Sequence, residues 1–134
     1  MRILGIDPGD RRVGLAVSDE LGITAQGLDT FDKRRDGDFL EFVGKVLQRY
    51  GIEEVVVGNP VHLSGDEGES SVKAQALAAE LQSRYSVKVT LWDERLSSEE
   101  AKRVLRGTRA DKGAVDKIAA VIILQSYLDF KEWH

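Results

Sequence analysis

The sequence predicts an α/β fold with a five-stranded mixed sheet and helices on both of its faces. Three observations lead to this class. The N-terminal part alternates apolar and polar residues between turn signals, which is typical of an antiparallel meander. Beyond it, helical stripes alternate with short strands, and such helical crossovers make neighbouring strands parallel. The length of 134 residues suits one domain with a sizeable core, so we expect residues 1–134 to form a single domain.

Three short strands are expected first. They comprise residues 2–7 (RILGID), 13–18 (VGLAVS) and 22–31 (GITAQGLDTF). The Asp-Pro-Gly sequence at 7–9 and the Asp-Glu-Leu-Gly sequence at 19–22 consist of residues that favour turns, so neighbouring strands should run antiparallel.

A helix and a fourth strand follow. Apolar residues recur at helical spacing over 39–50, after Asp36 and Asp38, which favour the start of a helix, and Gly51 favours its end. The valine-rich segment 52–59 is the fourth expected strand.

Three more helices and one strand are expected after this point. The helices comprise residues 74–85, 97–107 and 115–127, and the strand comprises residues 87–92. Ser97 and Glu100 form a capping box, which predicts the start of the middle helix. Residues 115–127 are apolar on almost all sides, so this helix should be buried on most of its surface.

Composition excludes several kinds of site. The chain has no cysteine, which rules out a disulfide, a zinc–thiolate site and a thiol nucleophile. Any metal must be bound by carboxylates or by the two histidines. The apolar run before Asp7 is too short for a signal peptide, and no run approaches the roughly 20 residues of a membrane-spanning helix. We therefore expect a cytoplasmic protein without membrane contact.

Positive charge is concentrated in one part of an acidic chain. The net charge of −4 argues against a nucleic-acid partner, because phosphate backbones attract Lys and Arg. Residues 101–117 nevertheless carry six basic residues against two acidic ones. Lys33, Arg34 and Arg35 form a second, smaller basic cluster. Each basic segment is either a nucleic-acid contact or an ordinary solvated surface.

Three carboxylates from distant parts of the chain are expected to meet at one edge of the sheet. The first strand ends at Asp7, and the fifth ends at Asp93 and Glu94. Only one side chain of that pair can face a shared site, because side chains alternate along a strand. Asp116 lies in the first turn of the apolar helix, where its burial requires a compensating positive group. Ligands of such sheets gather at the carboxyl ends of the strands.

Clustered carboxylates predict a metal-dependent nuclease. Mg²⁺ and Mn²⁺ prefer oxygen ligands, and two such ions about 4 Å apart can activate a water and stabilise the leaving oxygen of a phosphodiester. Taken singly, the acids also have structural explanations. Asp7 precedes Pro8 and Gly9 in a turn, and Asp116 is an ordinary helix-start residue.

Residues beside Asp7 add to the expected site. Gly9 and Gly14 keep the hairpin narrow and leave room for a phosphate backbone to approach. Arg11 and Arg12 face either that backbone or water. Trp92 is expected to pack within its strand rather than to stack on a base.

Four segments resemble the motifs of the YqgF family. They are GIDPGDRRVGLAVSD (5–19), VVVGNPVHLSGDEG (55–68), LWDERLSSEEA (91–101) and DKGAVDKIAAVIILQSYLD (111–129), in the family's order over nearly the whole chain. Proteins of this family are described as pre-16S rRNA nucleases and as Holliday junction resolvase-like proteins. The resemblance implies the ribonuclease H-like fold and trimming of the 5′ end of precursor 16S rRNA in bacterial ribosome biogenesis.

The resemblance also implies roles for single residues. The residues that match the family's catalytic, metal-binding acids are Asp7, Glu94 and Asp116, with Mg²⁺ or Mn²⁺ as the cofactor. Arg95 and Lys112 match basic positions that hold phosphate, and Arg109 lies in the basic segment that would orient the strand. Gly9, Arg11 and Arg12 complete the expected substrate-binding set.

The chain departs from the family pattern in one loop and the helix after it. Asn59-Pro60 and Leu63-Ser64-Gly65 stand where the family usually has Leu-Pro followed by Met-Asp-Gly. Lys73 and Gln75 stand where arginines are common. These differences bear on how the loop would grip a substrate.

Three other functions fit part of the sequence. The Asp-Pro-Gly turn and glycine hairpin resemble the phosphate-binding loop of actin-like and sugar-kinase ATPases, which clamp ATP between two domains. A non-catalytic RNA-binding or ribosome-assembly module, acting on the ribosomal subunit, would keep the fold and cleave nothing. A Holliday junction resolvase would cut branched DNA, usually as a dimer with two sites. The sequence leaves monomer and homodimer open.

Overall fold

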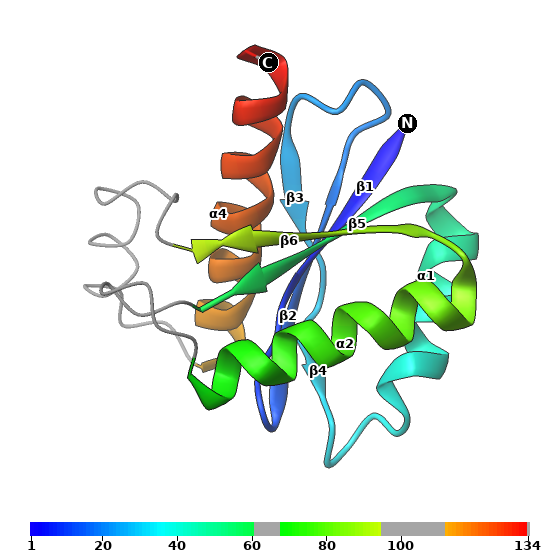
Figure 1. The fold of residues 1–134 in the computed structure, drawn as a ribbon, viewed down its shortest axis with the longest axis vertical. Coiled ribbons are helices and arrows are strands. Elements are labelled where there is room, and N and C mark those ends of the chain that lie inside the picture. Colours follow the sequence, from blue (N-terminus) through cyan, green and yellow to red (C-terminus); the bar gives the residue numbers. More distant parts are fainter. Residues whose placement is uncertain (61–67, 95–111, 134) are drawn as a thin grey trace.

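The computed structural model describes residues 1–60, 68–94 and 112–133. In these ranges a six-stranded mixed sheet carries helices on both faces (Figure 1), which confirms the predicted fold class. The strands are β1 (Arg2–Asp7), β2 (Arg12–Ser18), β3 (Ala25–Gly27), β4 (Phe31–Asp32), β5 (Ile52–Asn59) and β6 (Lys88–Asp93). The described helices are α1 (Phe39–Tyr50), α2 (Glu69–Tyr85) and α4 (Lys112–Trp133). The helix predicted over 97–107 lies outside the described residues.

The sheet has the order β3-β2-β1-β5-β6, and β4 pairs with β2 as well. β1 runs antiparallel to β2 and parallel to β5, and β5 runs parallel to β6. The predicted division into an antiparallel part and a parallel part is therefore confirmed. Because β1, β5 and β6 run parallel to one another, their carboxyl ends lie at the same edge of the sheet.

The prediction of one strand over 22–31 is wrong. Two short strands, β3 and β4, occupy this segment, and both pair with β2. β3 ends at Gly27, and Asp29 lies between the two strands; both are poor strand formers, so the ladder is interrupted. Leu28 still donates a hydrogen bond from its backbone N–H to the carbonyl oxygen of Leu15, at 2.9 Å. This hydrogen bond holds the segment between β3 and β4 against β2.

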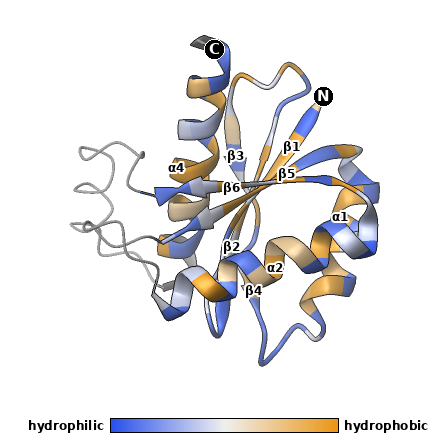
Figure 2. Cartoon of the chain, in the orientation of Figure 1, coloured by the Kyte–Doolittle hydropathy of each residue, from blue (hydrophilic) through white to orange (hydrophobic). Residues whose placement is uncertain are grey.

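Each face of the sheet has its own hydrophobic core. Leu4 and Ile6 of β1 pack with residues of α1 and α2. Ile3 of the same strand packs with residues of α4 on the other face. In Figure 1, α1 and α2 lie near each other and α4 stands apart from them. Figure 2 shows that hydrophilic residues gather in the β1–β2 turn and in the loop between β4 and α1.

The helix ends follow the predicted signals at α1. The side chain of Asp38 accepts a hydrogen bond from the backbone N–H of Glu41, and Gly51 adopts the left-handed conformation with φ 62°. An N-terminal cap of this kind contributes about 1 kcal/mol. Asp38 and Gly51 thus set the start of α1 at Phe39 and its end at Tyr50.

α4 differs from its prediction in two respects. It is buried along one stripe only, because it forms an outer layer with the sheet on one side, and Ile118 and Phe130 remain 36% and 45% exposed. It also begins at Lys112, so Asp116 lies beyond the first turn, which contains no acidic residue. None of the described helices is long and apolar enough to span a bilayer.

Candidate functional site

Asp7 lies at the carboxyl end of β1 and faces α4. Side chains repeat on one face of a strand every second residue, so Gly5 and Asp7 share a face. A Cβ atom added at Gly5 would lie 2.8 Å from the Cβ of Leu124 in α4. Asp7 itself is partly exposed at the end of the sheet. Its carboxylate is therefore placed at the sheet edge, beneath the N-terminal part of α4.

Gly14 brings Asp116 to the same edge. Gly14 is the Cα partner of Asp7 in the β1–β2 pair. A Cβ atom added at Gly14 would lie 2.1 Å from the backbone carbonyl oxygen of Asp116. Only a glycine allows α4 to approach β2 this closely. The backbone of Asp116 thus lies directly against the residue opposite Asp7.

Glu94 reaches the edge from β6. Gly58 of β5 is the Cα partner of Trp92, and a Cβ atom at Gly58 would lie 2.9 Å from Oε1 of Glu94. The Glu94 side chain therefore lies across β5, in the direction of β1. It forms a side-chain hydrogen bond with Asp7. Glu94 of the Asp93-Glu94 pair therefore contacts Asp7.

The electrostatic state of Asp7 reflects this crowding. Burial, repulsion by Glu94, the hydrogen bond with Glu94 and repulsion by Asp116 together raise the pKa of Asp7 well above its usual value. All of these causes disfavour the ionised carboxylate. Among the described residues, the surroundings of Asp7 thus favour its neutral form.

Arg12 is the positive group beside Asp116. Its Nε donates a hydrogen bond to Oδ2 of Asp116 at 3.2 Å, and both side chains are about 70% buried, with exposures of 29% and 28%. The predicted cationic partner of Asp116 is therefore present, and it is supplied by the protein itself. Arg11, the neighbouring residue, instead forms an ion pair with Asp32 at 3.5 Å.

The remaining predicted substrate residues are placed as follows. A Cβ atom at Gly9 would lie 2.2 Å from the carbonyl oxygen of Arg12, so the turn after β1 requires glycine there. Arg95 and Arg109 lie outside the described residues. Lys112 is the first residue of α4, and its side chain is not among those described. Of the basic segment 101–117, the structure describes the backbone from Lys112 and the side chains of residues 115–117.

The donor set suits a hard divalent cation. Among the described residues, no three His, Asp or Glu side chains already lie close enough together to form a metal site. Asp7 and Glu94 are in contact, whereas the carboxylate of Asp116 is turned to Arg12. Mg²⁺ is usually bound by one or two carboxylates together with waters and substrate phosphates. Two touching carboxylates with a third nearby fit that chemistry.

Two features of the site were not predicted. Gly58 provides the space for Glu94, and the only signal for it was a glycine directly after the valine run of β5. Asn59, at the end of that strand, accepts a 2.6 Å hydrogen bond from the hydroxyl of the buried Ser71.

Trp92 packs against Tyr127 with ring centroids 5.2 Å apart, which confirms its predicted role in packing.

Comparison with known proteins identifies relatives along the whole chain. The RuvX family, described as Holliday junction resolvase, matches residues 1–130. A protein of Halothermothrix orenii named "Putative pre-16S rRNA nuclease" is 42% identical over 135 residues, covering 98% of this chain and 96% of the relative. A protein of Koribacter versatilis with the same name is 46% identical over 132 residues, covering 96% and 86% of the two chains.

Solved structures show the same fold at low sequence identity. RuvC of Thermus thermophilus superposes with a TM-score of 0.62 at 20% identity, covering 99% of this chain and 97% of RuvC. The Fowlpox virus resolvase, solved with Holliday junction DNA, has a TM-score of 0.61 at 15% identity, covering 98% and 99% of the two chains. The order and direction of the strands are thus those of a RuvC-like, ribonuclease H-like fold.

Proposed function

The chain belongs to the RuvX family, and from that membership we propose that it is a nuclease that hydrolyses phosphodiester bonds near the 5′ end of precursor 16S rRNA. The observation that carries the proposal is the contact between Asp7 and Glu94, with Asp116 close enough to raise the pKa of Asp7. Like charges gathered at the ends of two strands destabilise a fold, so their presence requires a functional reason. Processing of rRNA would place the protein in the cytoplasm.

The acids would hold Mg²⁺ or Mn²⁺. Asp7 and Glu94 offer the first carboxylate oxygens, and Asp116 offers further ones if its contact with Arg12 opens. Bound at this edge, such an ion would polarise the scissile phosphate and make a nearby water more acidic. Residues 1–134 would act as one domain in this reaction.

The protein's own residues would orient the phosphate backbone. Gly9 keeps the turn after Asp7 narrow, so that a strand can approach the carboxylates. Arg12 lies beside Asp116 and is partly exposed, so its guanidinium can neutralise that carboxylate in the free protein and bind a phosphate oxygen in the complex. The basic residues Arg11, Arg95, Arg109 and Lys112 are further proposed phosphate contacts.

A cleavage assay tests the proposal. Wild type, Asp7→Asn and Asp129→Asn would be incubated with precursor 16S rRNA, unstructured RNA and a four-way DNA junction, each with Mg²⁺, Mn²⁺ or EDTA. Asp129 lies near the far end of α4, so its variant controls for a change in charge. We expect wild type and Asp129→Asn to cut the precursor with a divalent ion, and Asp7→Asn to lose at least about a hundredfold in rate.

The outcomes separate the rival functions. Preferential cutting of the DNA junction would replace the RNA substrate by branched DNA, which is the activity in the family's description. Binding of precursor rRNA without any cleavage would instead favour a non-catalytic assembly module. Equal cleavage by wild type and Asp7→Asn would contradict the proposed role of the acids.

A further inference from the structure

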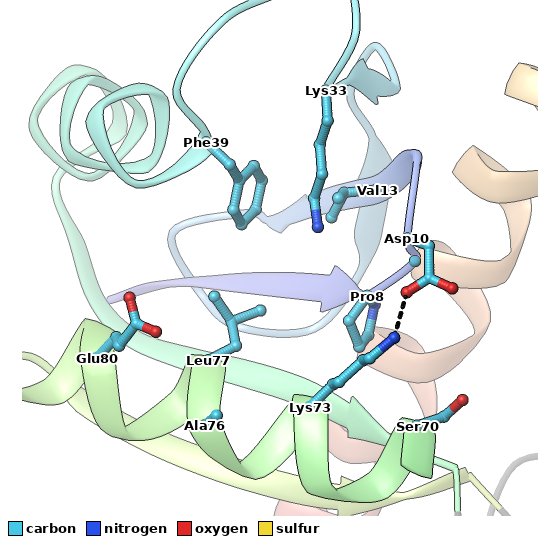
Figure 3. Close-up of a pocket in the computed structure, with 11 residues that line it drawn as sticks. Pro8, Asp10, Val13, Lys33, Phe39, Ser70, Lys73, Ala76, Leu77 and Glu80 are labelled. Carbon is cyan, nitrogen blue, oxygen red and sulfur yellow. Dashed lines mark hydrogen bonds and ion pairs between the residues drawn. The ribbon is translucent and has the colours of Figure 1, made fainter.

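A cavity of about 460 Å³ lies next to the candidate site, on the opposite face of the sheet (Figure 3). This volume is within the range of small-molecule sites. Its walls come from the β1–β2 turn, the loop after β4, the start of α1 and one side of α2. The lining residues are Pro8, Gly9, Asp10, Val13, Lys33, Phe39, Ser70, Lys73, Ala76, Leu77 and Glu80.

The inner part of the cavity is apolar and well packed. Phe39 and Val13 are buried, and the ring of Phe39 packs edge-on against Phe31 with centroids 5.2 Å apart. In Figure 3, Phe39 points into the cavity from one side and Leu77 of α2 points into it from the other. Two apolar surfaces that face each other suit a flat ring inserted between them.

The rim carries charge of both signs. Lys73 donates a 2.9 Å hydrogen bond to Oδ1 of Asp10 and lies 3.4 Å from Oε1 of Glu69, so two carboxylates already neutralise it. Lys33 enters the cavity from the side opposite α2 (Figure 3). In the described parts of the chain, the ammonium group of Lys33 forms no ion pair. The charge of Lys33 does help to lower the pKa of Asp10, and Glu80 is a second acid in the lining. The cavity therefore presents an ammonium group without an ion-pair partner among the described residues, beside an apolar slot.

The cavity and the acidic edge are adjacent along the chain. Pro8 lines the cavity and directly follows Asp7, and consecutive Cα atoms are about 3.8 Å apart. Because side chains alternate, Asp7 faces α4 while Pro8 faces α1 and α2. A strand with its scissile phosphate at Asp7 would need to pass only the narrow turn at Gly9 to reach the cavity.

We infer that this cavity binds one unstacked nucleotide of the substrate strand, with its base between Phe39 and Leu77 and a phosphate at Lys33. The inference rests on the proposed function and specifies its substrate, because such a site selects single-stranded segments whose bases are free to leave the stack. A base-paired nucleotide would not enter, since its ring is stacked within the duplex.

Binding measurements with matched variants test the inference. Fluorescence anisotropy would use a labelled single-stranded RNA of about twelve nucleotides, the same RNA as a blunt duplex, and AMP as competitor. Asp7→Asn would serve as the background so that the RNA is not cut. Ala76→Phe fills the cavity from an exposed position of α2, and its control is Ala79→Phe on the same helix, which does not line the cavity. Lys33→Met is compared with Lys45→Met on α1.

We expect Ala76→Phe and Lys33→Met each to weaken binding of the single strand by at least about fivefold, with little change for the duplex and for the two controls. Unchanged single-strand binding in both cavity variants would overturn the inference. So would AMP competing as tightly as the strand, since the cavity would then serve a free nucleotide. Cleavage by the same variants with Asp7 restored separates the two proposals: a wild type that cuts no nucleic acid refutes the nuclease, whatever the anisotropy shows.

Discussion

Glu54 is the most deeply buried charge among the described residues, and it lies away from the candidate site. Its exposure is 1%, and it accepts hydrogen bonds from Tyr127, from Thr90 at 3.0 Å and from Lys131 at 3.1 Å. Burial alone would raise the pKa of Glu54, but these hydrogen bonds outweigh it and lower the pKa. The cluster is therefore a satisfied structural network that joins β5 and β6 to α4.

Tyr127 gives this network a measurable pH dependence. Burial and the hydrogen bond to Glu54 raise the pKa of Tyr127 to about 12. A pKa raised on folding adds stability that is complete below about pH 10, the unfolded value, and is lost as pH rises towards about 12. We expect Tyr127→Phe to lower the free energy of unfolding by about 1–3 kcal/mol at pH 8, and by less at pH 11.

Urea denaturation at several pH values would measure this effect. Tyr50→Phe is the control, because Tyr50 lies on α1 and does not contact Glu54. A cost of Tyr127→Phe that is the same at pH 8 and pH 11 would contradict the role of the phenol proton.

Asp7 is expected to reduce stability in the absence of metal. Its folded pKa is raised, mainly by burial and then by Glu94. Its contribution is therefore favourable only below the unfolded pKa of about 4, and it declines as pH rises through the folded value. We expect Asp7→Asn to increase the free energy of unfolding by about 0.5–2 kcal/mol at pH 8 in EDTA, measured by urea denaturation.

The same comparison at pH 4 should show a much smaller gain, because Asp7 is then protonated in the wild type. Asp129→Asn provides the charge-matched control. If Asp7→Asn proved less stable than wild type at pH 8, the ionised Asp7 carboxylate would not destabilise the fold as its buried, acidic surroundings indicate.

Among the elements, the packing of α4 on β2 decides where Asp116 lies. Gly14 and Gly27 both lie under α4, but they meet different atoms. A Cβ at Gly14 would lie 2.1 Å from the backbone oxygen of Asp116, whereas a Cβ at Gly27 would lie 2.4 Å from Cγ of Lys117. Backbone cannot move without shifting the helix, but a lysine side chain can rotate.

Gly14→Ala should therefore lower the free energy of unfolding by more than Gly27→Ala does. We expect a loss of about 1–3 kcal/mol for Gly14→Ala, as for other overpacked sites, together with loss of cleavage because Asp116 is displaced. Gly27→Ala should cost less and leave cleavage intact. Thermal unfolding and the cleavage assay would measure both effects, and equal costs for the two variants would show that α4 adjusts freely.

At the scale of the whole molecule, the acids come from β1, the end of β6 and α4, so a metal bound by them would link three parts of the fold. Ligand binding to the native state alone raises its stability by mass action. We expect saturating Mn²⁺ to raise the Tm of the wild type by about 5 °C and that of Asp7→Asn by much less. An equal shift in both proteins would mean that Mn²⁺ binds elsewhere.

Local signals in the sequence predicted most of the fold. The apolar periodicities, the Asp38 cap and Gly51 located α1, and the valine run located β5, because these features depend on neighbours a few residues away. The strand over 22–31 and the deep burial of α4 were wrong, because strand continuity and helix burial depend on which layers lie alongside. The observed resemblance to RuvC confirms the predicted class at the level of topology.

The sequence by itself determined the fold class and the family, and it predicted that Asp7, Glu94 and Asp116 gather at one edge of the sheet. Only the tertiary structure decided that Glu94 contacts Asp7, and that Arg12 pairs with Asp116, a residue 104 positions away. It also placed a cavity on the opposite side of the same strand end. These relations follow from the register of β1, β5 and β6 and from the close approach of α4 at Gly14, which no local pattern encodes.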